Sequence, residues 1–485
     1  LPAQRGRGGT GMTDTVAGPA TAERIASGLG PELEAPWEIF GEQLLHHELH
    51  LNGRRIELRR GPIEVEGYAL RIFRPTGDGR TRIGFASSND LSPEGLRRAL
   101  RTAETTAQYS SFPAPSIPLG PPRVPSPGPS RVDPRLRDAP SESILDFAQA
   151  LLAEFPDSGE VTPSFGSIRA THGESSIVNS SGLAARQTGS RVDFEWAVKA
   201  SGGPEGRPPG EYWVNCEARR LDRDELGIDV PAWLARAQDV RRAEPPPSGA
   251  STVLFPPEVL RDIVPATLGY RLSGAAELRK IAVPIGEVVG SPMVSVRDDP
   301  TIPGGFGSEG FDDEGRPGEA RVMVEEGTVR GHYYDLTHAA ALGTESTASG
   351  HRILGTFPPW VRFTNSVQPG PSNLLIQPGA GGSDRDLIET AGEGIWLDQL
   401  GYAFPDPFAG TFGGEIRLGY RIRGGRLAEP VRGGTVGGLV LGPAGAPSLL
   451  RGVAGVGNKA RPVGAFRSPT LLAEGILVAG SGPTR

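Results

Sequence analysis

Hydrophobic and polar residues alternate in a block that begins near residue 35, with the period expected of β-strands that have one buried face. The run EQLLHHELHLNGRRIELRR (42–60) alternates on both sides of Asn52-Gly53, a pair that favours the tight turn of a β-hairpin. Two more strands are predicted at 67–73 and 82–87. The pattern therefore predicts a hairpin that is followed by further strands.

Helical periodicity then appears at four places. The first helix is predicted to begin at Pro93, because Ser92 before it can cap the first turn. Others are expected near 231–240, at 256–273 and after the proline-rich segment 112–140. That segment is expected to be extended, as a linker or as an ordered strap over the surface. The apolar stripe of the helix that follows it consists of Ile144, Phe147, Leu151 and Phe155.

A proline cluster at 244–249 divides the chain into two parts. Beyond residue 281 nearly every segment is predicted to be a strand or a glycine-containing turn. We therefore expect an α+β fold, in which an N-terminal mixed α/β domain (35–243) is followed by a large β-rich C-terminal domain (250–485). Residues 1–34 are expected to form a flexible leader.

Composition and charge narrow the class of protein without identifying it. The 485 residues carry a net charge of −7 and no dense run of Lys or Arg, which argues against direct nucleic-acid binding. No apolar run approaches the roughly 20 residues needed to cross a bilayer, so we expect a cytoplasmic protein without membrane contact. The single cysteine, Cys216, excludes an internal disulfide and any zinc site built from several thiolates.

The histidine-rich segment HHELH (46–50) invites comparison with a zinc-peptidase helix. A His-Glu-x-x-His motif would need a second histidine at position 51, which is a leucine. In a strand, His46 and His50 would lie about 13 Å apart, too far to share one metal ion. The alternation instead predicts a polar strand face that carries His46, Glu48 and His50.

Two further patterns have ordinary structural explanations. The G-x-G-x-x-G matches at 6–11 and 305–310 lack the preceding strand and following helix of a dinucleotide site, so they are attributed to chance. The acidic pairs Asp298-Asp299 and Asp312-Asp313 stand in turns. Carboxylates in turns more often accept hydrogen bonds from backbone amides than act as an acid–base couple.

Several stretches, read in order, resemble the TldD/PmbA family of metallopeptidases. The most specific is the long segment that contains DDPTIPGG and FDDEG. The stretches are GFASSNDLSPEGLRRAL (84–100), IGEVVGSPMVSVRDDPTIPGGFGSEGFDDEGRP (285–317), PGPSNLLI (369–376), GVGNK (455–459) and RSPTLLAEGILVAG (467–480).

The resemblance also implies where a zinc site would lie. TldD-type members carry a His-Glu-x-x-x-His helix upstream of the segment that matches 285–317, and a late cysteine completes their site. The equivalent helix here, 256–274, contains no histidine, and the region 452–458 contains no cysteine. The chain is therefore similar to the TldE (PmbA-like) branch, which implies no metal or other cofactor in this chain and zinc in a partner subunit.

The function implied by the resemblance is that of a non-catalytic subunit in a bacterial, cytoplasmic, heteromeric zinc metallopeptidase. A TldD-like partner would supply zinc and hydrolysis in a heterodimer or larger complex. This chain would help to enclose and bind an extended peptide substrate for proteolytic trimming or maturation. A β-rich wall suits that role, because a peptide can add to a sheet edge as a strand.

One loop is expected to shape the chamber that holds the peptide. Its residues are Asp298, Asp299, Gly304, Gly305, Asp312 and Asp313. Structural turn residues remain an alternative reading of the same six. Two other functions also stay open: a self-sufficient peptide hydrolase with its site near 298–314, and a stand-alone peptide-binding or scaffold protein.

Overall fold

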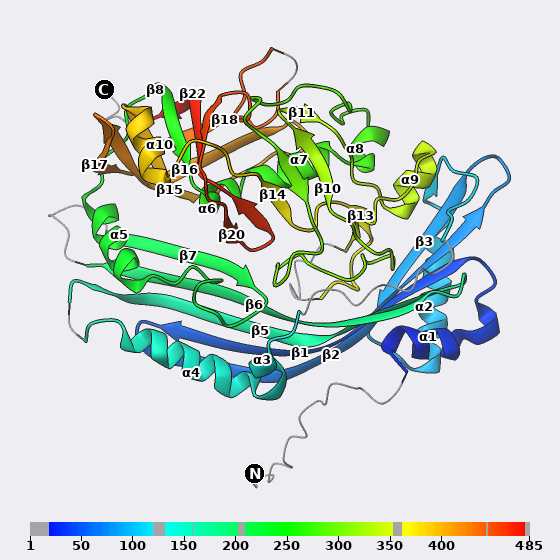
Figure 1. Ribbon diagram of the computed structural model, residues 1–485. Coiled ribbons are helices and arrows are strands. Elements are labelled where there is room, and N and C mark those ends of the chain that lie inside the picture. Colours follow the sequence, from blue (N-terminus) through cyan, green and yellow to red (C-terminus); the bar gives the residue numbers. More distant parts are fainter. Residues whose placement is uncertain are drawn as a thin grey trace, which may run out of the picture.

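The protein has two layers, a long curved sheet and a C-terminal half that rests on its concave face (Figure 1). The computed structural model describes residues 19–119, 131–157, 159–201, 209–352, 361–442 and 445–480. The combination of helices and mainly antiparallel sheets confirms the expected α+β class.

The curved sheet has seven antiparallel strands in the order β4-β3-β2-β1-β5-β6-β7. Its strands are β1 (Trp37–Asn52), β2 (Arg55–Pro75), β3 (Thr81–Ser88), β4 (Ser111–Phe112), β5 (Val161–Asn179), β6 (Ala184–Ala200) and β7 (Gly210–Ala218). The predicted hairpin joins β1 to β2. Asn52 pairs with Arg55, and Gly53 takes φ +58°, a conformation that glycine adopts without strain.

Helices pack on this sheet, most of them away from the C-terminal half or at the ends of the sheet, and the last of them contacts both β7 and the C-terminal half (Figure 1). They are α1 (Thr21–Leu29), η1 (Gly30–Glu32), α2 (Pro93–Thr106), α3 (Pro134–Asp138), α4 (Pro140–Ala153) and α5 (Val230–Arg242). The predicted start of α2 is confirmed, because the Ser92 hydroxyl accepts a hydrogen bond from the Gly95 amide. Beneath the sheet, Ile144 and Leu151 of α4 pack in one core with Phe194 and Trp196.

The region expected to be a flexible leader is partly folded. Residues 1–18 lie outside the described residues, but Thr21–Leu29 form α1. Ile25 and Leu29 are buried and pack in one core with Ile39 of β1. Their spacing of four residues places both on one helical face, and burial of that face holds the helix on the sheet.

The proline-rich segment also differs from a simple extended linker. Ile117 and Leu119 are buried in a cluster with Phe73 of β2 and Leu336. Pro134–Asp138 form the short helix α3, because proline suits a first helical turn and Asp133 caps it. Residues 120–130 of this segment lie outside the described residues.

The C-terminal half contains a six-stranded sheet, β11-β10-β9-β14-β21-β20, and a second seven-stranded sheet, β15-β8-β22-β18-β16-β17, with β19 paired to β22. Strands β12 and β13 form a separate pair. The strands are β8 (Gly249–Phe255), β9 (Val296–Asp298), β10 (Arg321–Glu325), β11 (Thr328–Val329), β12 (Gly350–His351), β13 (Gln368–Pro369), β14 (Leu374–Ile376), β15 (Gly394–Gly401), β16 (Thr411–Arg423), β17 (Arg426–Val431), β18 (Thr435–Leu439), β19 (Val453–Val456), β20 (Arg461–Val463), β21 (Phe466–Ser468) and β22 (Leu471–Ala479).

The helices of this half are short. They are α6 (Pro257–Leu260), α7 (Val264–Arg271), α8 (Gly274–Leu278), α9 (Leu336–Leu342) and α10 (Asp384–Ala391). The single helix expected at 256–273 is thus two helices. Pro265 lies in the first turn of α7 and has no amide hydrogen, so the chain restarts a helix there. Among the described residues, the helices are all too short or too polar to cross a lipid bilayer.

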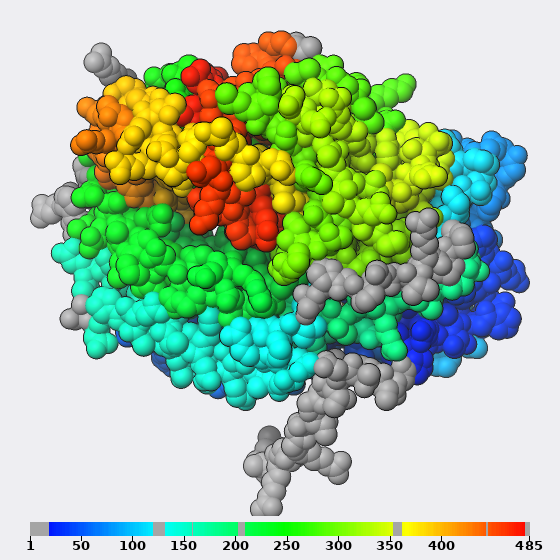
Figure 2. Space-filling model, in the orientation of Figure 1, coloured from blue at the N-terminus to red at the C-terminus, as the bar shows by residue number. Residues whose placement is uncertain are grey.

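Figure 2 shows the two layers in contact across one face, with a hollow between the green and red segments. In this region a cavity is lined by Tyr212 and Val214 of β7 and by Arg461 and Val463 of β20. The interface between the two layers therefore contains a cavity as well as packed hydrophobic side chains.

Candidate functional site

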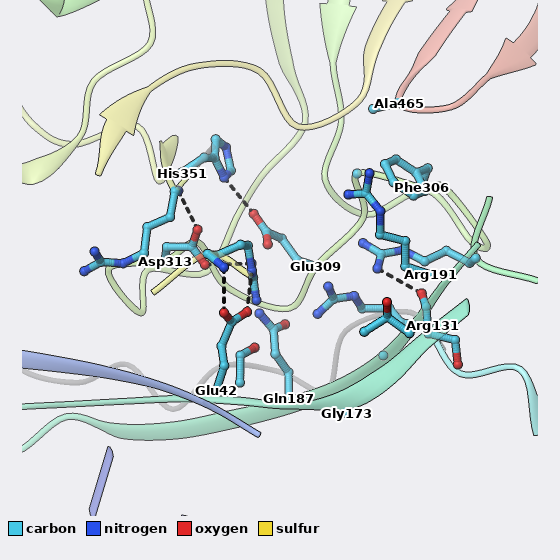
Figure 3. A pocket seen from close by; sticks show the side chains of 18 of the residues that line it. Glu42, Arg131, Gly173, Gln187, Arg191, Phe306, Glu309, Asp313, His351 and Ala465 are labelled. Atoms are coloured by element: carbon cyan, nitrogen blue, oxygen red, sulfur yellow. Dashed lines mark hydrogen bonds and ion pairs between the residues drawn. The ribbon is translucent and has the colours of Figure 1, made fainter. Parts of the chain in front are cut away.

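A second cavity, of about 300 Å³, lies between the concave face of the curved sheet and the loops of the C-terminal half (Figure 3). Strands β1, β5 and β6 form one wall, and the loop 306–313 with β12 forms the opposite wall. The lining residues that Figure 3 labels are Glu42, Arg131, Gly173, Gln187, Arg191, Phe306, Glu309, Asp313, His351 and Ala465.

The pairing register explains why polar side chains gather on the sheet wall. Residues that pair directly across antiparallel strands point to the same face. Glu42 of β1 pairs with Ser175 of β5, which pairs with Gln187 of β6, and all three line the cavity. Alternate residues such as Ile168 and Phe194 point to the opposite face and join the core with α4.

Asp313 is the one predicted loop residue that lines the cavity. Its Oδ1 accepts a hydrogen bond from Arg362 Nη1 at 2.8 Å, and its Oδ2 accepts one from the Arg352 amide at 2.6 Å. Arg362 Nε also donates to Glu42 Oε1 at 3.0 Å. Burial lowers the pKa of Arg362, but Asp313 and Glu42 outweigh it and raise that pKa above its usual range. The guanidinium therefore joins β1 to the loop.

Glu309 and His351 form a second ion pair in the same wall. Glu309 Oε1 lies 3.0 Å from His351 Nδ1. Burial lowers the pKa of His351, but the adjacent Glu309 carboxylate outweighs it and raises the pKa to about 9. The imidazole is thus protonated at neutral pH and neutralises Glu309.

The other predicted aspartates hold the loop together instead of facing the cavity. Asp298 on β9 accepts hydrogen bonds from the Ser372 amide (2.9 Å) and hydroxyl (3.0 Å), and burial raises its pKa to about 7. Asp299 accepts one from the Thr301 amide at 2.8 Å. Asp312 accepts three from backbone amides, at 2.9, 2.9 and 3.0 Å. The contacts of Asp299 and Asp312 match the turn-stabilising alternative, whereas Asp298 lies on a strand and bonds to Ser372, 74 positions away.

The two predicted glycines have conformational roles in the same loop. Gly304 has φ +69°, which favours glycine. A Cβ at Gly305 would lie 2.5 Å from Ser308 Oγ, so no side chain fits there without movement. Both glycines let the chain turn and present Phe306 to the cavity. A direct role of the loop in substrate binding stays a prediction.

Sequence reasoning missed the arginines of this cavity. No regular spacing in the sequence identifies them, because they come from five separate positions that only the fold brings together. They are Arg131, Arg191, Arg219, Arg352 and Arg362.

The histidine-rich strand behaves partly as predicted. His46 and Glu48 do share a face, with 3.1 Å between His46 Nε2 and Glu48 Oε1, and His50 Nε2 lies 3.6 Å from Glu48 Oε2. His46 and Glu48 are buried, however. Burial lowers the pKa of His46 to about 4, so the ring is neutral at pH 7.

The region where the family resemblance places zinc does not fit that metal. Arg261, directly after α6, donates to Asp262 Oδ1 at 2.9 Å and to Asn215 Oδ1 at 2.6 Å. A guanidinium here repels a cation, and the helix offers neither imidazole nor thiolate. Within the described ranges, no group of three or more His, Cys, Asp or Glu side chains could hold a metal ion.

Curated relatives match part of this chain. A metalloprotease from Methanocaldococcus jannaschii is 31% identical over 209 residues, which cover 42% of this chain and 44% of that protein. A metalloprotease from Methanothermobacter thermautotrophicus is 30% identical over 245 residues, 50% of each. The match therefore spans half or less of the length of these relatives.

Solved structures share the fold over nearly the whole chain. TldE from Thermococcus kodakarensis superposes with a TM-score of 0.76 at 20% identity and covers 94% of this chain and 99% of that one. A putative modulator of DNA gyrase from Thermotoga maritima superposes with a TM-score of 0.75 at 19% identity, with the same coverage. At such identities the likeness shows the fold alone.

Family models cover most of the chain in three consecutive matches. PmbA/TldA metallopeptidase domain 1 matches residues 37–107, the central domain matches 134–237, and the C-terminal domain matches 248–480. Together with the shared fold, these matches show that the chain belongs to the PmbA/TldD metallopeptidase family.

Proposed function

We propose that this chain is the non-catalytic, peptide-binding subunit of a heteromeric zinc metallopeptidase, whose TldD-like partner supplies zinc and hydrolysis. The observation that carries the proposal is the chemistry around α6. Where the zinc helix of the family is expected, Arg261 is fixed by Asp262 and Asn215, and no histidine follows in α7. Zinc needs neutral imidazole or thiolate ligands.

The cavity supports the binding part of the proposal. It is enclosed by two layers of the fold and lined by charged side chains that are locked by ion pairs, such as Arg362 with Glu42 and Asp313. Side chains held in this way bind a ligand without a large loss of conformational entropy. A rigid, polar wall suits a subunit that orients a peptide while another subunit cleaves it.

The alternative of a self-sufficient hydrolase has less support from the geometry. Asp298 accepts a hydrogen bond from the Ser372 amide, Asp312 accepts one from the Gly350 amide, and the Glu309 carboxylate is paired with His351. General acid–base catalysis needs a group within reach of the substrate that can exchange a proton. These three carboxylates do not meet that description.

The proposal is tested by purifying the chain alone and after co-expression with the TldD-like protein of the same genome. Cleavage of unfolded peptides should be absent with the chain alone and should appear with the mixture. The two proteins should also co-elute in size-exclusion chromatography. Peptide cleavage by the isolated chain would refute the non-catalytic role, and failure to co-elute would refute the subunit role.

A further inference from the structure

Three arginines gather in one part of the cavity and come from separate elements. Arg191 lies on β6, Arg219 follows β7, and Arg131 precedes α3. The guanidinium groups of Arg191 and Arg219 both lie 5.1 Å from the centre of the Phe306 ring. Figure 3 shows Arg131 and Arg191 on the same side of the cavity, away from His351.

Three of the carboxylates that line the cavity already have cationic partners. Glu42 and Asp313 pair with Arg362, and Glu309 pairs with His351. Glu309 and Asp313 still raise the pKa of Arg131, and Glu309 raises that of Arg219, but burial and the neighbouring guanidinium groups outweigh them.

Among the described residues, Arg131 and Arg219 have no carboxylate within ion-pair distance, whereas Arg191 is paired with Asp193 at 2.7 Å. Arg219 Nη1 donates to the Ser190 carbonyl at 3.2 Å, and the buried Nε atoms of Arg131 and Arg219 have no hydrogen-bond partner among the residues that the structure describes. A buried donor without an acceptor is costly, and a bound acceptor would remove that cost.

The electrostatics agree with the geometry. Burial lowers the pKa of Arg131 to about 10. Burial, followed by the nearby Arg131 and Arg362, holds the pKa of Arg219 well below its ordinary value. Both guanidinium groups are charged at neutral pH, and each lowered pKa means that the positive charge is poorly compensated. An anion placed between them would be attracted.

We propose that Arg131 and Arg219 bind a carboxylate group of the peptide substrate. Guanidinium groups match the planar, two-oxygen geometry of a carboxylate. Phe306 next to them offers an apolar surface to the neighbouring part of a peptide, and about 300 Å³ accommodates a peptide end or one side chain. The carboxylate belongs either to the peptide C-terminus or to an Asp or Glu side chain. That the ligand is a peptide rests on the proposed function.

The test uses the full chain without any partner and measures binding by fluorescence anisotropy. The probes are N-terminally labelled penta-alanine with a free C-terminus, the same peptide as its C-terminal amide, and an amide in which the central residue is glutamate. The free acid should bind at least tenfold more tightly than the plain amide. The glutamate-containing amide should bind like the free acid if the site accepts side chains, and like the plain amide if it reads the C-terminus.

Variants connect binding to the two arginines. Arg131→Gln and Arg219→Gln should each weaken binding of the free acid at least tenfold. Arg220→Gln removes the neighbouring exposed arginine, which is paired with Glu225, and should leave binding unchanged. If a glutamine variant does not fold, Arg131→Lys keeps the charge without the planar fork and should still weaken binding several-fold.

Equal affinity for all three peptides, or no binding of the free acid by the folded chain, would overturn the proposal. The result is separable from that of the proposed function. A chain that binds carboxylates but never joins a peptidase keeps this inference and loses the proposed function. A chain that activates a partner but does not distinguish acid from amide gives the opposite result.

Discussion

At the scale of single residues, the cavity is defined by buried ionic groups that no sequence pattern identifies. Of the six residues predicted for the loop, Asp313 lines the cavity and the other five shape the loop around it. The acidic pairs could be found because they are adjacent in sequence. Arg362, the partner of Asp313, lies 49 positions away in the sequence, and His351, the partner of Glu309, lies 42 positions away. Only the fold brings these pairs into contact.

The His351–Glu309 pair makes stability depend on pH. The folded-state pKa of His351, about 9, lies above the ordinary value of 6.5. The pair therefore stabilises the fold fully below about pH 6.5, and this contribution is lost as pH rises through 9, by about 3 kcal/mol in total. Denaturant unfolding between pH 6 and 10 should show this loss for the natural chain and not for Glu309→Gln, whose His351 titrates at lower pH. Parallel curves for the two proteins would contradict the assignment.

At the scale of helices and strands, local sequence patterns predicted boundaries best where a single residue caps a helix or forms a turn. The cap Ser92 located the start of α2, and Gly53 located the hairpin turn. Local sequence patterns failed where tertiary packing determines whether a helix forms or where it ends. Helix α1 forms in a region expected to be flexible because Ile25 and Leu29 find a core, and the helix expected at 256–273 is divided at Pro265.

The packing of α2 on β3 depends on a glycine, whose lack of a side chain allows a close approach. A Cβ at Gly84 of β3 would lie 2.0 Å from the Ala103 carbonyl oxygen of α2. Gly84→Ala should therefore lower the free energy of unfolding by about 1–3 kcal/mol or more, because helix and strand must separate. The matched control is Gly413→Ala in β16, where a Cβ meets nothing within 4 Å, and its effect should stay within about 0.5 kcal/mol. Equal effects in urea denaturation would show that the close approach is unimportant.

At the scale of the whole molecule, buried charges join the curved sheet to the C-terminal half. Arg71 of β2 donates to Glu38 of β1 at 2.8 Å and to Glu314, which directly follows Asp313, at 2.7 Å. All three side chains are buried. The alternation along β2 predicted a strand. It could not predict that Arg71 in this strand pairs with Glu314, which lies 243 positions later in the sequence.

Removing this guanidinium should loosen the two layers. Arg71→Gln leaves Glu314 without its guanidinium partner and leaves Glu38 with the more distant Arg352, at 3.4 Å. We expect a loss of about 3–5 kcal/mol in the free energy of unfolding. Arg74→Gln on the same strand breaks only the exposed pair with Glu104 and should cost less than about 1 kcal/mol. Thermal and denaturant unfolding of both variants measures the difference. Similar small losses would mean that Arg71 does not join the layers.

In the function proposed above, this chain binds substrate while a partner performs the hydrolysis. The most direct measurement is peptide cleavage by the complex after the metal-ligating histidines of the TldD-like partner are replaced, with this chain left unchanged. We expect the complex still to form, as size-exclusion chromatography would show, and cleavage to disappear completely. Cleavage that persists in such a complex would place a catalytic site in this chain and refute the proposed function.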